Sequence, residues 1–244
     1  ALAAARVRPW RAPYREIDYA TMSRKSYRRS ARRAIVLVSP YVVLPPRHGA
    51  AKRTQRLAHE LAREFDVILL SDEGDLYDAA SERCHDDFAS VHLLRGRPAD
   101  GSSHAHSRAH RIRNHSHRGL VSELVRVVEV HRPVAVLVEH VELAGLVTAR
   151  PVPRPPFVLT LQDVLLAPED PAQAAADRYE LALIDRFDGR IVTSPEDQAL
   201  LGTRESCLVE NGVDVEDGRR YTPSTGRRRI LFRGPFRSAP NWDA

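Results

Sequence analysis

The chain has 244 residues, of which 43% are hydrophobic and 28% are charged, and its formal net charge is +5. These proportions exclude an intrinsically disordered chain and leave room for one large or two small domains. No apolar stretch approaches the roughly 20 residues that span a bilayer, and the first residues lack the apolar core of a signal peptide. The two cysteines, Cys84 and Cys207, make no disulfide framework, so we expect both to be buried, reduced thiols.

The positive charge gathers in two patches. Residues 24–33 carry six positive charges and no negative one, and residues 104–118 carry four Arg and five His. Basic patches attract phosphate-bearing partners such as nucleotides, nucleic acid or anionic lipid, but solvated, loosely ordered runs have the same composition. The histidines of 104–118 are irregularly spaced and no Cys joins them, which argues against a zinc site.

Taken in chain order, the pattern predicts an α/β domain. Residues 1–33 are basic and aperiodic, and we expect a poorly ordered N-terminal extension. Apolar runs typical of strands then cover 34–39, 66–71, 90–95, 134–139, 157–162, 190–194 and 207–210. Helical spacing covers 52–64, a short part of 72–87, 120–131, 141–149, 172–187 and a segment after Ser194, while the insert 96–115 is expected to be a loop. Alternating strands and helices indicate a parallel sheet covered on both faces, so 34–210 is predicted to be a doubly wound, Rossmann-like domain.

The sequence after residue 210 predicts the beginning of a second domain. Residues 211–228 are polar and arginine-rich, and we expect an interdomain linker there. Residues 229–244 open with a new apolar strand, Arg229 to Phe232. One strand has no partner for its backbone groups, so we expect 229–244 to be the first strand and loop of a truncated C-terminal domain.

Ligands of such sheets bind where the parallel strands end, and several familiar motifs are missing there. No G-x-G-x-x-G follows the first strand, and no G-x-x-x-x-G-K-[ST] or G-x-S-x-G occurs in the chain. Their absence argues against a dinucleotide oxidoreductase, a P-loop NTPase and an α/β-hydrolase.

The loop after the first strand instead reads PPRHGAAKR. A glycine at a helix N-terminus lets backbone amides approach an anion, and the helix dipole favours negative charge there. Arg47, Lys52 and Arg53 add positive charge nearby. The segment Gly49-Ala50 is therefore either a cradle for a diphosphate or an ordinary turn between strand and helix.

Polar residues also follow the fourth and fifth strands. His140 comes directly after the fourth strand, where it is either a site residue or a packed histidine. Gln162 and Asp163 follow the fifth, and Asp163 is either a hydroxyl ligand or a turn residue. Parallel strands end at one edge of the sheet, so these residues are expected on the ligand side.

Seven pieces of the chain, in this order, carry a family resemblance. They are SPYVVLPPRHGAAKR (39–53), FDVILLS (65–71), VEHVELAG (138–145), FVLTLQDV (157–164), RYELALIDRFDGRIVTSPEDQALL (178–201), LVENGVD (208–214) and ILFRGPFRSAPNWDA (230–244). With this succession the chain resembles glycosyltransferase family 4, the retaining enzymes of GT-B fold. GT-B enzymes have two Rossmann-like domains facing across a cleft. The resemblance implies that this chain is the N-terminal, mainly acceptor-side domain with the start of the C-terminal one.

The resemblance also implies roles for individual residues. It makes His140 the catalytic-site residue near the transferred sugar. The implied donor- and phosphate-binding residues are Gly49, Ala50, Lys52, Arg53, Ser194, Glu196 and Gly234. The implied acceptor-binding residues are Arg47, Gln162 and Asp163, and no metal ligand is implied.

The chain departs from the family at several positions. Ala50 stands where a second glycine is usual, and Gln162 stands where a second histidine is frequent. Glu210 replaces a proline, and Arg233 and Pro235 occupy a loop that normally holds small residues. Such changes are typical of a diverged or degenerate copy.

The function implied is transfer of a sugar from a nucleoside diphosphate sugar to an acceptor hydroxyl with retention, in polysaccharide, glycolipid or other glycoconjugate synthesis. The expected partners are the nucleotide-sugar donor and a carbohydrate or lipid-linked acceptor, with no cofactor, no metal and no nucleic acid. We expect a cytoplasmic location, with peripheral contact between the basic segments and anionic lipid at the inner membrane face as a hypothesis. The alternative is a truncated, inactive domain that binds an acceptor or a partner carrying the missing half.

Overall fold

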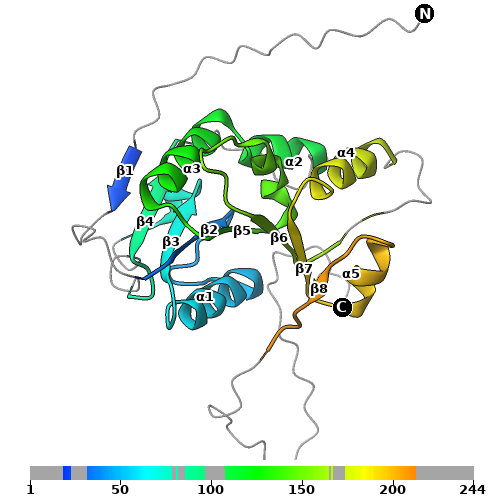
Figure 1. Cartoon of the computed structure of the whole chain (residues 1–244), viewed down its shortest axis with the longest axis horizontal. Coiled ribbons are helices and arrows are strands. Elements are labelled where there is room, and N and C mark those ends of the chain that lie inside the picture. Colours follow the sequence, from blue (N-terminus) through cyan, green and yellow to red (C-terminus); the bar gives the residue numbers. More distant parts are fainter. Residues whose placement is uncertain are drawn as a thin grey trace, which may run out of the picture. The chain divides into compact units, whose positions relative to one another are not determined.

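The fold is built on one eight-stranded sheet (Figure 1). The computed structural model describes residues 19–22, 32–78, 81, 86–96, 108–164, 166 and 174–212. The elements named below belong to one compact unit, Ala1–Asn211. The predicted linker from residue 213 onward, the predicted strand at 229–232 and the predicted site residue Gly234 lie outside the described residues, as does Cys84.

The strand order is β1-β4-β3-β2-β5-β6-β7-β8. The strands are β1 (Tyr19–Met22), β2 (Ala34–Ser39), β3 (Asp66–Ser71), β4 (Ser90–Leu94), β5 (Ala135–Glu139), β6 (Phe157–Leu161), β7 (Gly189–Val192) and β8 (Cys207–Leu208). Every neighbouring pair from β4 to β8 is parallel, and β1 alone pairs antiparallel, with β4. The chain winds from β2 out to β4, then returns to the other side of β2 and continues from β5 to β8. The strand order therefore reverses between β2 and β5, which is where doubly wound sheets bind ligands.

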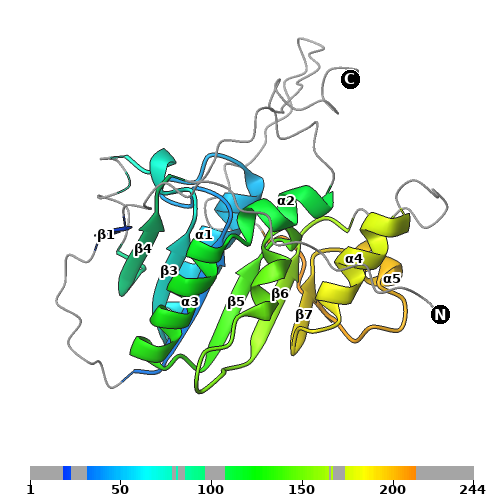
Figure 2. The same cartoon turned by 90° about the horizontal axis from the view of Figure 1, so that it is seen from above.

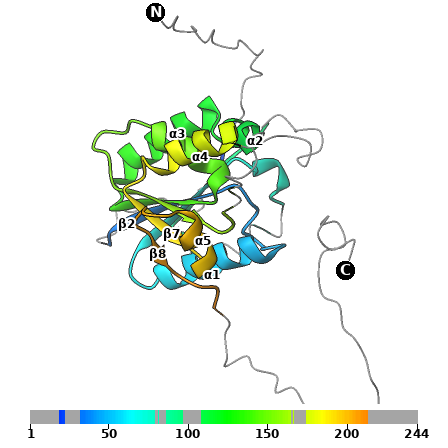
Figure 3. The same cartoon turned by 90° about the vertical axis from the view of Figure 1, so that its right-hand side faces the viewer.

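Helices cover both faces of the sheet (Figures 1 and 3). On one face lie α2 (Arg108–His115), α3 (Arg118–His131), α4 (Ala174–Ile184) and the 3₁₀ segment η4 (Val141–Thr148). On the other lie α1 (Gly49–Leu61) and α5 (Pro195–Leu200), and a single 3₁₀ turn, η1 (Gly74–Leu76), follows β3. Figure 2, viewed from the side of α3 and α4, shows β3, β5, β6 and β7 running side by side beneath them.

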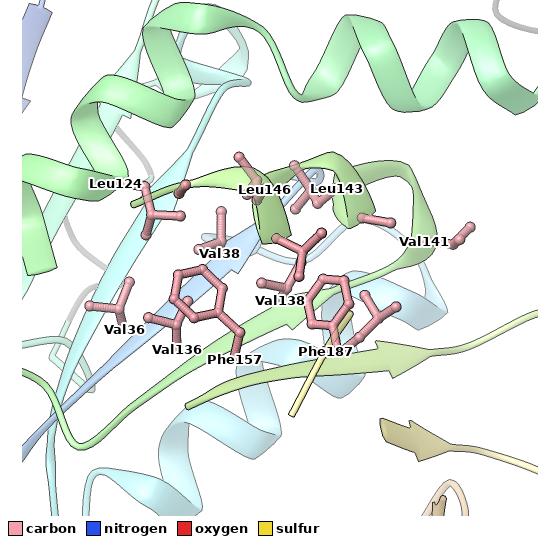
Figure 4. Packing of buried hydrophobic residues seen from close by; sticks show 14 of the residues in the cluster. Val36, Val38, Leu124, Val136, Val138, Val141, Leu143, Leu146, Phe157 and Phe187 are labelled. Atoms are coloured by element: carbon pink, nitrogen blue, oxygen red, sulfur yellow. The ribbon is translucent and has the colours of Figure 1, made fainter. Parts of the chain in front are cut away.

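Two hydrophobic clusters fill the space between the sheet and these helices. On the α3 side, Val36, Val38, Val136 and Val138 of the central strands pack beneath α3 and η4, together with Phe157 (Figure 4). Leu37 and Leu69 point to the α1 side and belong to the second cluster. Successive residues of a strand face opposite sides of the sheet. A sheet with helices on both faces therefore needs apolar residues at nearly every position of its central strands. The run AIVLVS of β2 meets that need, and all six of its residues are buried.

The structure confirms the predicted fold class, a parallel, doubly wound, Rossmann-like α/β sheet. The short helix predicted at 141–149 is the 3₁₀ segment η4. The structure differs from the sequence prediction in three details. The insert predicted as a loop contains α2, and residues of the N-terminal extension form β1. Cys207 is exposed, contrary to expectation, because the two-residue strand β8 lies at the edge of the sheet. No helix within the described ranges is long and apolar enough to cross a bilayer.

Candidate functional site

The candidate site lies where β2, β5, β6 and β7 end. The backbone register pairs Val38 of β2 with Val138 of β5, and Glu139 with Thr160 of β6. The residues after these strands therefore emerge at one edge of the sheet, on both sides of the reversal in strand order. The two predicted landmarks, Gly49 after β2 and His140 after β5, thus follow neighbouring strands at the same edge.

The loop after β2 ends in a capped helix N-terminus. Nδ1 of His48 accepts a hydrogen bond from the backbone N–H of Ala51 at 3.4 Å, so α1 begins at Gly49, three residues before the predicted start. Burial lowers the pKa of His48, which favours the neutral ring that such a cap requires. A Cβ built on Gly49 would meet no protein atom within 4 Å. Gly49 and Ala50 therefore stand in the first turn of a 13-residue helix, with open space beside the glycine.

Tyr41 links this loop to the end of β5. Its ring meets His48 edge to face, with centroids 4.6 Å apart, and meets His140 in the same manner at 5.3 Å. Burial, followed by the negative charges of Glu142 and Asp163, raises the pKa of Tyr41 well above its usual range. The hydroxyl therefore stays protonated, and the tyrosine acts as a neutral packing surface between two imidazoles.

His140 has an unusual backbone and an unusual side-chain environment. Its φ of 79° and ψ of 144° are rare for a residue other than glycine. The conformation is held from both sides, because the N–H of His140 donates to the carbonyl oxygen of Thr160 at 2.9 Å and its own carbonyl accepts from Leu143 at 3.2 Å. Nδ1 is buried without a hydrogen-bond partner among the described residues, and the nearest carboxylate oxygen, Oε2 of Glu142, is 4.0 Å away. Burial lowers the pKa of His140, so the ring is neutral near pH 7.

Glu139 is a buried carboxyl beside the site that was not among the predicted site residues. Its Oε1 accepts from the Thr160 hydroxyl at 2.9 Å, and its Oε2 accepts from Nε2 of Gln162 at 3.3 Å and from the Thr54 hydroxyl at 3.5 Å. Burial raises the pKa of this carboxyl, although these hydrogen bonds and the charge of Arg53 oppose the rise. The sequence signal was a glutamate that ends an otherwise apolar strand. Glu139 ties α1, β5 and β6 together directly beneath the edge.

Most of the remaining predicted site residues lie near the strand ends. Gln162 is oriented by Glu139, and Asp163 is exposed at the same strand end. Ser194 caps α5 by accepting from the N–H of Asp197 at 3.0 Å, while Glu196 and Lys52 are exposed. These residues border the strand ends.

Two predicted residues have other partners in the structure. Arg47 pairs with Asp78 at 3.3 Å, with both side chains more than half exposed. Arg53 donates to the backbone carbonyls of Val209 and Glu210 and to Oδ1 of Asn211. In this conformation the Arg53 guanidinium holds protein oxygens rather than facing a diphosphate.

On the α2 side, the basic patch at 104–118 takes part in a cluster of charged contacts that the sequence did not predict. Nδ1 of His115 lies 2.9 Å from Oδ2 of Asp72, which can accept a hydrogen bond from it, and Nε2 of His115 is 3.6 Å from Oε2 of Glu142. Arg111 donates to Oε1 of Glu142 at 3.0 Å. The only signal in the sequence was the helical spacing of Arg108, Arg111, Ile112 and His115 within a polar insert.

Among the described residues, one cluster of side chains could hold a metal cation. Ligand atoms of Asp72, Glu73 and His115 lie within 4.8 Å of one another. A carboxylate–histidine set suits a divalent metal, and Glu142 on the other ring nitrogen would orient the histidine. Arg111, bound to that same Glu142, brings a positive charge that opposes a cation. The described residues thus fit a metal only in part.

Among solved structures, the chain is similar to sucrose-phosphate synthase from Thermosynechococcus elongatus, a glycosyltransferase of GT-B fold. The TM-score is 0.51 at 16% sequence identity, and the likeness covers 76% of this chain and 49% of that one. The chain has the fold of a GT-B domain. It spans about half the length of the synthase. No protein-family model and no curated protein matches the sequence.

Proposed function

We propose that the chain is the acceptor-side domain of a retaining GT-B glycosyltransferase that uses a nucleoside diphosphate sugar. The observation that supports the proposal is the pair of ring contacts at the strand reversal, by which Tyr41 links His48, the cap of the helix that begins at Gly49, to the buried imidazole of His140. The fold likeness to a glycosyltransferase supports the same conclusion.

The reaction needs a place for the leaving diphosphate and a place for the sugar. Breaking the bond between the sugar C1 and the diphosphate oxygen, and forming one from C1 to the acceptor oxygen, releases a nucleoside diphosphate and a proton. Backbone amides at Gly49 and Ala50, aided by the α1 dipole and by Lys52, would stabilise the diphosphate charge without a metal. His140 would then bind the sugar through its imidazole, and Gln162 and Asp163 would face the acceptor.

Amide chemical shifts of the ¹⁵N-labelled full chain test this assignment. UDP-glucose, GDP-mannose and ADP-glucose at millimolar concentration serve as donor probes, with UDP and inorganic pyrophosphate as partial probes. We expect pyrophosphate to shift the amide signals of Gly49 and Ala50, and at least one nucleotide sugar to shift His140 as well. If no probe moves any of these three signals, the proposal is wrong.

Matched variants make the test specific. Lys52→Ala should weaken the pyrophosphate response, whereas Arg56→Ala, which removes another exposed positive charge from the same helix, should leave it intact. His140→Ala should abolish the sugar-dependent shift and keep the pyrophosphate response. Measuring nucleoside diphosphate release in the same samples separates a chain that transfers sugar from one that only binds.

A further inference from the structure

We propose that α2, the helix within the His/Arg-rich insert, is a positioning element of the His140 site. Arg111 holds the carboxylate of Glu142 beside Nδ1 of His140, with His115 packed next to it, and this carboxylate keeps the imidazole proton on Nδ1. The proposal rests on the proposed function, because it assigns Nε2 of His140 as the atom left to accept a hydrogen bond from a sugar hydroxyl.

Three contacts fix α2 against the body of the domain. At its start, Arg108 forms ion pairs with Asp177 and Glu180 of α4. In its middle, Ile112 is fully buried in the cluster beneath α3 and η4. Just beyond its end, Ser116 packs so closely on Gly145 of η4 that a Cβ at Gly145 would lie 2.5 Å from the Ser116 hydroxyl oxygen.

The side chains between these anchors reach Glu142. Arg111 and His115 are one helical turn apart, so both project from the same face of α2. Arg111 binds Oε1 of Glu142 at 3.0 Å, and His115, itself held by the buried Asp72 at 2.9 Å, approaches Oε2 at 3.6 Å. The Glu142 side chain is 15% exposed, which leaves it little freedom to turn toward solvent.

Oε2 of Glu142 therefore lies between two imidazoles. It is 3.6 Å from Nε2 of His115 and 4.0 Å from Nδ1 of His140. The latter distance exceeds a hydrogen bond, but a buried polar atom without a partner requires an explanation, and a carboxylate facing it supplies one. A shift of about 1 Å in either side chain would make the Nδ1–H···Oε2 bond at ordinary N···O distances.

The charged groups around His140 are consistent with this role. Glu142 of η4 and Asp163 after β6 favour a proton on the ring, whereas His115 and Arg111 of α2 disfavour it. From the loop after β2, Tyr41 packs on the ring, and it remains neutral. The carboxylate of Glu142 thus selects the nitrogen that carries the proton, while burial and the charge of Arg111 keep the ring from becoming an imidazolium. The hydrogen bond at one ring nitrogen sets the tautomer, and hence what the other nitrogen can do.

Long-range ¹H–¹⁵N NMR of the imidazoles in the ligand-free full chain tests the proposal directly. We expect wild-type His140 to be the Nδ1–H tautomer. Glu142→Ala should shift it toward Nε2–H and lower its pKa, because a carboxylate that favours the charged ring is lost. Arg111→Gln should also reduce the Nδ1–H population, and Arg111→Lys should restore part of it. Arg113→Gln, which removes an exposed charge from the same helix, should change nothing.

A packing variant provides a second arm. Gly145→Ala displaces Ser116 and the end of α2 without removing any charged group, and it should disturb the His140 tautomer in the same direction. A wild-type Nε2–H tautomer, or a tautomer that is unchanged in Glu142→Ala, overturns the proposal. Because the measurement uses no donor, its outcome is separate from the amide-shift test, whose failure alone would remove the transferase assignment.

Discussion

The guanidinium of Arg53 donates a hydrogen bond to the carbonyl oxygen of Val209 at 2.8 Å, across 156 positions of sequence. The same side chain reaches the carbonyl of Glu210 at 3.1 Å and Oδ1 of Asn211 at 3.0 Å. One arginine of α1 thereby holds the segment that leaves β8. Because β8 has only two residues, this segment gains little from the sheet itself.

Arg53→Ala should loosen the segment after β8 while leaving the core intact. Hydrogen bonds from a charged group contribute about 1.5 kcal/mol or more, which corresponds to roughly tenfold faster exchange of the amide hydrogens in this segment. Hydrogen exchange of the backbone amides at 207–211, read by mass spectrometry, measures the change. Arg56→Ala on the same helix is the control, and equal protection in the two variants would show that Arg53 does not hold the segment.

Glu139→Gln should change how stability depends on pH. Burial raises the pKa of Glu139, so the protonated carboxyl is favoured in the folded state, and the resulting stabilisation is lost as pH rises above the unfolded value of 4.5 through the folded one. The variant, which cannot ionise, should therefore gain stability relative to wild type as pH rises from 4 to 8. Urea unfolding across this range measures the difference. Parallel curves for the two proteins would contradict the prediction.

Glu123 of α3 should contribute stability with the opposite pH dependence to that of Glu139. Burial alone would raise its pKa, but hydrogen bonds from Arg126 and His92 outweigh burial and lower the pKa to about 2. Its stabilisation is present above pH 4.5 and lost as pH falls toward 2. At pH 7, Glu123→Gln should lower the free energy of unfolding by at most about 3 kcal/mol, which is the free energy that corresponds to this pKa shift. The actual loss should be smaller, because half of the Arg126 side chain is exposed and solvent screens its charge.

The acid titration of Glu123→Gln provides its own check. The difference between wild type and variant in urea unfolding should shrink steadily below pH 4.5. The lowered pKa of His131, about 4 because of burial and the nearby charges of His92 and Arg126, adds a loss of stability between pH 6.5 and 4 that both proteins share. A gap that stays constant down to pH 3 would mean that Glu123 acts through packing instead.

Removal of divalent metal should leave the proposed donor site unchanged. The diphosphate charge is expected to meet backbone amides and Lys52, so EDTA should not alter the shifts of Gly49 and His140 caused by a nucleotide sugar. If EDTA abolishes the shifts and added Mg²⁺ or Zn²⁺ restores them, the expectation is wrong. His115→Ala would then tell whether Asp72, Glu73 and His115 hold the ion.

Much of the fold was predictable because its strands are short and apolar on both faces. The run at 34–39 became β2 with the predicted bounds, as did 66–71 for β3. Residues 108–115 escaped prediction because the helix buries a single aliphatic side chain, Ile112, and depends otherwise on ion pairs with distant elements. Whether such a helix forms depends on its tertiary partners rather than on its local sequence pattern.

The candidate site was predictable in position but not in contacts. The ends of β2 and β5 placed Gly49 and His140 at one edge, as alternation of strands and helices required. No spacing in the sequence indicates that Tyr41 packs between two imidazoles, or that Arg53 binds Val209. Those relationships depend on side-chain directions across elements far apart in the chain.

The left-handed backbone of His140 has a consequence for any attempt to improve this protein. A glycine there would relieve strain on the order of 1 kcal/mol. A library screened only for heat resistance should therefore enrich glycine at this position and discard the imidazole, whereas one screened for the proposed binding of a nucleotide sugar should retain it. The two screens would therefore select different residues at position 140.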